Sequence, residues 1–138
     1  MTMTRTITFV CLHGSAKSLI AAEYCARLAV ERGLDLRATS AGTEPDPGIP
    51  PKVIEGLLRD GIDVRGRRPR LATREDLATA AHVVSFGCDL KEIAPASLTI
   101  ERWDDIPAVS ADFDAARDAI LARLRRLLAE WESPKRAG

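Results

Sequence analysis

A short segment near the start of the chain combines cysteine, glycine, lysine and serine at a spacing that suits anion chemistry. Residues 11–18 read CLHGSAKS and lie between a β-branched run at 6–10 and a long stretch rich in alanine and leucine. A loop that joins a strand to a helix can surround a tetrahedral anion with backbone N–H groups at the positive end of the helix. The sequence therefore predicts an oxyanion-binding loop made of Leu12, His13, Gly14, Ser15, Ala16 and Lys17.

Cys11 is placed to act as the nucleophile of this loop. Fixed N–H dipoles and a nearby cation favour the thiolate, which is the nucleophilic form of cysteine. Lys17 would add positive charge at the far end of the loop, and the Ser18 hydroxyl could hydrogen-bond the thiolate or a departing phosphoryl group. We therefore predict that Cys11 attacks a phosphate-like centre with the help of Lys17 and Ser18. A cysteine that ends a buried strand is also a common core residue.

The elements that must position this loop alternate between strand and helix. Short apolar runs predict strands at 6–10, 34–40, 82–86 and 98–102. Apolar residues at three- and four-residue spacing predict helices at 18–32, 51–61 and 111–132, whereas four prolines exclude regular structure from 43–51. This alternation predicts a four-stranded parallel sheet in a three-layer, doubly wound α/β sandwich.

Ligands of such sheets bind beyond the carboxyl ends of the strands. Four segments are expected to meet there: the Cys11 loop, a turn at 40–43, residues 87–89 and residues 103–105. Cys88 would then lie at the edge of the site, where it is either a thiol that resolves an oxidised Cys11 or a half-buried structural residue. Cys25 falls on the first helix and is predicted to be part of the core.

Composition narrows the class of protein. The 138 residues include 20 Lys plus Arg and 20 Asp plus Glu, so no net charge attracts the chain to nucleic acid or to an anionic membrane. Three cysteines are too few for a disulfide scaffold, and no apolar run reaches the ~18 residues of a membrane span. We expect a cytoplasmic protein whose residues 1–132 form one domain and whose residues 133–138 form a frayed tail. No metal-ligand spacing is present, and no cofactor is expected.

Residues 9–18 (FVCLHGSAKS) resemble the signature of the low-molecular-weight protein tyrosine phosphatases and the related arsenate reductases. In that superfamily the loop reads Cys, five residues, Arg, Ser. The resemblance therefore implies that Cys11 and Ser18 occupy the family's cysteine and serine positions, and that Lys17 stands in place of the arginine. Residues 40–45 (SAGTEP) resemble the family's second loop, and residues 61–64 with 69–71 resemble a segment typical of the reductases.

Residues 103–107 (WDDIP) resemble the acid loop of the family, in which an Asp beside a Pro protonates the leaving group. This resemblance implies that Asp105 is the general acid, with Asp104 as the alternative. A phosphotyrosine substrate would favour aromatic walls, and the loops at 43–51 and 105–109 contain none.

Two reactions begin with the attack of Cys11. A phosphatase hydrolyses the resulting thiophosphate with water, whereas an arsenate reductase uses a second thiol, from Cys88 or from an external thiol reductant. The alternative from another class is a non-catalytic module that binds phosphate or a phosphorylated partner. Lys17 favours that alternative, because lysine keeps the positive charge of arginine but lacks its bidentate fork.

Overall fold

The sheet of this protein is parallel throughout. In the computed structural model, which describes residues 4–132, strands β1 (Arg5–Cys11), β2 (Leu36–Gly42), β3 (His82–Ser85) and β4 (Ile100–Arg102) lie in the order β2-β1-β3-β4. β1 is central and fully buried from Ile7 onward, because strands flank it on both sides and helices cover both faces. The predicted four-stranded parallel sheet is confirmed.

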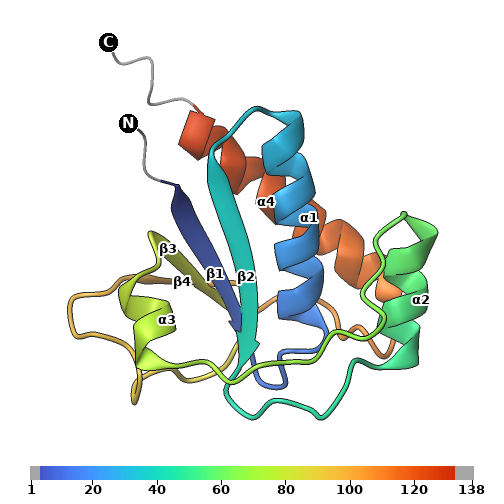
Figure 1. Cartoon of the computed structure of the whole chain (residues 1–138), viewed down its shortest axis with the longest axis horizontal. Helices are drawn as coiled ribbons and strands as arrows, with labels where there is room; N and C mark the ends of the chain where they lie inside the picture. The colour runs from blue at the N-terminus through green and yellow to red at the C-terminus, as the bar shows by residue number, and fades with distance from the viewer. Residues whose placement is uncertain (1–3, 133–138) are drawn as a thin grey trace.

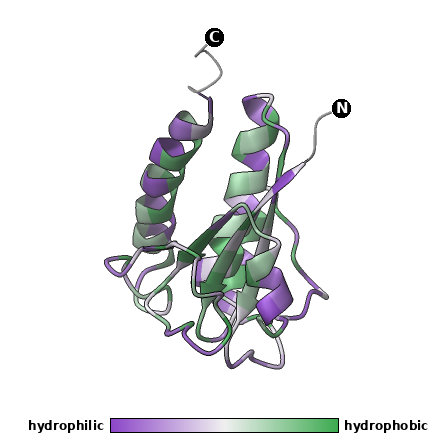
Figure 2. Cartoon of the chain, turned by 90° about the vertical axis from the view of Figure 1, so that its left-hand side faces the viewer, coloured by the Kyte–Doolittle hydropathy of each residue, from purple (hydrophilic) through white to green (hydrophobic). Residues whose placement is uncertain are grey.

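Helices cover both faces of the sheet, as expected for a three-layer fold (Figure 1). Helices α1 (Lys17–Glu31), α2 (Pro51–Arg59) and α4 (Phe113–Glu132) pack with Ile7, Phe9 and Cys11 in the larger apolar cluster. The short helix α3 (Arg74–Ala78) contributes Leu77 to a second cluster with Val10 on the opposite face. Figure 2 shows the most hydrophobic residues gathered along the strands between these helices. None of the helices between residues 4 and 132 is long and apolar enough to cross a membrane.

Both boundaries of the second strand differ from the sequence-based expectation. The second strand was expected at 34–40 but runs from Leu36 to Gly42, because Leu34 still closes the end of α1 through its N–H bond to the Ala29 carbonyl. Residues 40–42, expected in a turn, instead continue the strand and pair with residues 9–11 of β1. The sequence reading also missed α3, which begins with a capping box between Thr73 and Asp76. The expected tail at 133–138 lies outside the described residues.

The carboxyl ends of β1 and β2 point toward the same edge of the sheet, at the bottom of Figure 1. The loop that leads from β1 into α1 and the long loop that leads from β2 into α2 lie together at this edge. Since the first of these loops contains Cys11 and the residues up to Lys17, the fold places the candidate site where a doubly wound sheet binds its ligands.

Candidate functional site

Cys11 lies at the end of β1 and is 7% exposed. The Ser18 hydroxyl lies 3.0 Å from its Sγ atom, and the backbone N–H of Gly14 donates to the same sulfur at 3.2 Å. The Ser18 hydroxyl is also 3.5 Å from the Ala41 carbonyl. The N–H of Gly14 donates to the sulfur and so stabilises a thiolate, and the contact between the Ser18 hydroxyl and the sulfur agrees with the predicted pairing of Cys11 and Ser18.

The backbone of the loop leaves several N–H donors free. Within residues 4–132, the N–H groups of residues 12, 13, 15 and 16 make no hydrogen bond to another residue. Helix α1 starts at Lys17, and no side chain caps its first turn at Ala16. These donors and the positive end of the helix dipole are therefore available to an oxyanion beside Cys11.

A direct backbone contact between the two loops fixes the shape of the anion site. Gly14 has φ +66°, and a Cβ atom on Gly42 would lie 2.6 Å from the Gly14 nitrogen. The N–H groups of Thr43, Glu44 and Asp46 donate to the carbonyls of residues 11, 12 and 13. The loop after β2 thus follows the Cys11 loop closely, and only a glycine fits at each point of nearest approach.

Asp46 connects two loop side chains, and its role was missed by the sequence reading. Its carboxylate accepts a hydrogen bond from the Ser15 hydroxyl at 2.8 Å and lies 3.4 Å from Nδ1 of His13. The same His13 nitrogen lies 3.1 Å from the Glu44 carbonyl. His13 therefore belongs to the network that holds the two loops together.

A pocket of about 490 Å³ opens beside Cys11. Lys17, which is partly buried, lines this pocket, and it forms no ion pair with the part of the chain at 4–132. Part of the wall is apolar and comes from four separate segments of the chain, which contribute Leu12, Ala16, Val53, Phe86, Ala108 and Val109. The one aromatic ring among them belongs to Phe86, directly after β3, and not to the two loops from which aromatic walls were sought.

The two candidate acids do not line the pocket in this structure. Asp105 forms an ion pair with Arg123 of α4, and Asp104 accepts from Arg102 at 3.2 Å. Trp103 before them is 1% exposed and packs against Phe86. Trp103 belongs to the same apolar cluster as Cys11, whereas the Arg123 pair directs Asp105 toward α4. A role as general acid stays a prediction.

The other two cysteines are buried away from the loop. Cys25 is 0% exposed in the core, as predicted, and burial raises the pKa of its thiol to about 12. Cys88 belongs to the cluster on the opposite face of the sheet, where its Sγ lies 3.6 Å from the Val10 carbonyl. Burial is the main cause that raises the pKa of Cys88, and the negative charge of Cys11 adds to it. Both thiols are therefore protonated at neutral pH.

Metal binding has no evident place in the described part of the chain. Between residues 4 and 132, no three His, Cys, Asp or Glu side chains come together in a group that could hold an ion.

Comparison with known proteins places this geometry in a family. A protein of Halobacterium salinarum named putative arsenate reductase is 24% identical over 97 residues, which are 69% of this chain and 68% of that protein. The crystal structure of YfkJ from Bacillus subtilis has a TM-score of 0.82 at 23% identity and covers 94% of this chain and 95% of its own. A low molecular weight protein tyrosine phosphatase from T. tengcongensis has a TM-score of 0.82 at 20% identity, over 92% of this chain and 99% of that one.

At these identities the structural likeness establishes the fold alone. The assignment to a family comes from a family model, described as low molecular weight phosphotyrosine protein phosphatase, that matches residues 6–117. This range includes the Cys11 loop, all four strands and the segment that contains Asp104 and Asp105. The chain therefore belongs to the low molecular weight phosphotyrosine protein phosphatase family.

Proposed function

We propose that this protein hydrolyses phosphate monoesters through a covalent intermediate on Cys11. Family membership supports a cysteine-dependent enzyme that acts on phosphate-like oxyanions. The observation that carries the proposal is the pocket of about 490 Å³ beside Cys11, with its partly apolar wall. A bare oxyanion would leave most of this volume empty, whereas the organic leaving group of an ester would fill it.

The proposed reaction consists of two displacements at phosphorus. The Cys11 thiolate attacks phosphorus, the bond to the leaving oxygen breaks, and that oxygen takes a proton from Asp105 or from water. Water then attacks the thiophosphate, the phosphorus–sulfur bond breaks, and inorganic phosphate leaves with the thiolate restored. Lys17 and the free N–H groups of the loop hold the phosphoryl oxygens in both steps. Asp105 has to leave Arg123 before it can take part.

Arsenate reduction is the second candidate, and the similarity of this chain to a protein named putative arsenate reductase favours it. In that reaction a thiol attacks the sulfur of a Cys11–arsenate adduct, so that arsenite leaves and a disulfide forms from the two thiols. Cys88 lies in the apolar cluster on the opposite face of the sheet from the larger cluster that contains Cys11. Cys88 would have to leave the Val10 carbonyl to reach Cys11, and otherwise an external thiol reductant would take its place.

Hydrolysis of para-nitrophenyl phosphate tests the leading proposal. We expect turnover by the wild-type protein, none above background by Cys11→Ser, and near wild-type turnover by Cys25→Ala as the matched cysteine control. Arsenite formation from arsenate with a dithiol is measured in parallel, and it should require both Cys11 and a second thiol if the protein is a reductase. Phosphate binding by calorimetry without either Cys11-dependent activity would contradict both reactions and support a binding module.

A further inference from the structure

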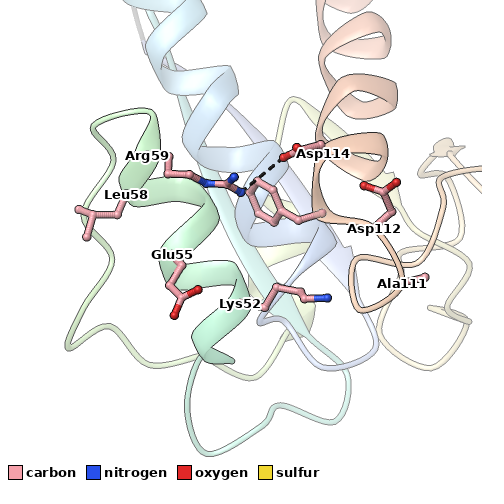
Figure 3. Close-up of a pocket in the computed structure, with 8 residues that line it drawn as sticks. Lys52, Glu55, Leu58, Arg59, Ala111, Asp112 and Asp114 are labelled. Carbon is pink, nitrogen blue, oxygen red and sulfur yellow. Dashed lines mark hydrogen bonds and ion pairs between the residues drawn. The ribbon is translucent and has the colours of Figure 1, made fainter.

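Lys52 lies where the Cys11 pocket meets a second depression in the surface. It lines the pocket beside Cys11 and also a neighbouring pocket of about 740 Å³ between α2 and the start of α4. Figure 3 shows the second pocket, with Lys52 and Arg59 of α2 directed toward the segment that includes Asp112 and Asp114. Any substrate that extends from Cys11 into this groove has to pass Lys52.

The charge of Lys52 is not neutralised by a carboxylate. Its ammonium donates to the Ser110 carbonyl at 2.9 Å, and within residues 4–132 it forms no ion pair. An ammonium group has three donors, so two remain for a ligand. Arg59, the other cation of the groove, is by contrast paired with Asp114 at 3.4 Å. The junction of the two pockets therefore presents one free positive charge.

The backbone beneath Lys52 is held rigidly. Val53, the next residue, is 1% exposed and lines the Cys11 pocket. One turn further along α2, the ring of Phe113 packs so closely on Gly56 that a Cβ there would lie 2.4 Å from it. These contacts fix α2 against the start of α4, so the position of Lys52 relative to Cys11 does not depend on a loose loop.

We propose that Lys52 binds a second anionic group of the substrate, a carboxylate or a phosphate on the leaving group next to the transferred phosphoryl group. Lys17, inside the loop, holds the phosphoryl group itself, and Lys52 lines the same pocket and also the neighbouring groove. Glu55, Asp112 and Asp114 line the groove beyond and repel anions, so the attraction is confined to the junction. The inference rests on the proposed ester hydrolysis and specifies which esters are preferred.

The test compares phenyl phosphate with 3-carboxyphenyl phosphate, whose leaving groups are similar in acidity. In the wild-type protein we expect kcat/KM to be about fivefold higher for the carboxylated ester, as one partly exposed charge pair allows. Lys52→Met should bring the ratio of the two values close to one, and Lys52→Arg should keep it above one. Lys91→Met is the control, because Lys91 lines only the separate pocket near Cys88 and should leave the ratio unchanged.

Binding of the same two esters to Cys11→Ser, measured by calorimetry, separates this inference from the proposed function. If the wild-type protein hydrolyses both esters with nearly equal kcat/KM, the proposed role of Lys52 is overturned and the proposal of ester hydrolysis stands. A preference that survives in Lys52→Met overturns it as well. Absence of turnover together with a Lys52-dependent binding preference overturns ester hydrolysis and supports the anion subsite. Absence of binding and of turnover overturns both.

Discussion

Replacing Gly42 with alanine tests whether contact between the two loops sets the geometry of the anion site. The new Cβ atom would lie 2.6 Å from the Gly14 nitrogen and 2.9 Å from the Leu12 oxygen, whereas ordinary contacts begin at 3.4 Å. The Cys11 loop therefore has to move back by about 0.8 Å. A displacement of ~1 Å in a catalytic constellation costs up to about 100-fold in rate, and overpacking of this kind costs about 1–3 kcal/mol of stability. We expect kcat/KM to fall by at least about 30-fold.

The assay uses para-nitrophenyl phosphate turnover, phosphate affinity by calorimetry and thermal unfolding. Gly48→Ala is the matched control, because it lies in the same loop and a Cβ there meets nothing within 4 Å. That control should keep wild-type turnover and phosphate affinity. If Gly42→Ala keeps more than half of the wild-type kcat/KM and unfolds at the same temperature, the loop shape does not depend on this contact and the reasoning is wrong.

Three further changes address the cation, the acid and the core. Lys17→Ala should abolish phosphate binding, and Lys17→Arg should raise turnover about tenfold because the bidentate guanidinium orients the phosphoryl oxygens. An unchanged phosphate affinity in Lys17→Ala would contradict the assignment of Lys17 to the anion site. Asp105→Asn should slow the hydrolysis of phenyl phosphate by at least about 100-fold, and Arg123→Ala should speed this hydrolysis because it releases Asp105 from its ion pair. A larger loss of activity in Asp104→Asn would assign the general acid to Asp104 instead. Burial raises the pKa of the Cys25 thiol to about 12, whereas the thiol of the unfolded chain has a pKa of about 8.5. The unfolded chain therefore loses this proton first, and the free energy of unfolding falls as the pH rises between these two values. Tm should fall more steeply with alkaline pH in the wild-type protein than in Cys25→Ala, and equal slopes would refute this argument.

The part of the site that could be predicted is the part encoded locally. A strand, a loop and a helix can be predicted in that order from 14 residues that contain an apolar run, a cysteine, a glycine and a lysine. The structure places both Gly14 and Ser18 in contact with the sulfur of Cys11, in agreement with that local pattern. The alternation of apolar runs was likewise enough for the parallel sheet, because each element carries its own periodicity.

What could not be predicted depends on the path of long loops. The bond between Ser15 and Asp46 joins residues 31 positions apart and depends on how a proline-rich loop crosses the end of the sheet. The aromatic wall comes from Phe86, directly after a different strand, and the cation shared with the neighbouring groove comes from Lys52 on α2. The position of Asp105 is set by an arginine 18 residues further on, which no local pattern around the acid indicates.

The structure also bears on whether the site is an enzyme or a binding module. Contacts of Gly14, Gly42 and Asp46 within the protein hold the loop that carries the oxyanion donors. The candidate acid is the component out of place, and it is held by one ion pair in which the Asp105 side chain is 71% exposed. An exposed pair of this kind contributes about 0–1 kcal/mol, so it favours the paired state at most about fivefold over the released one. An energy difference that small slows catalysis only slightly, so we predict that Lys17, which the family resemblance puts where the relatives have arginine, has the larger effect on turnover.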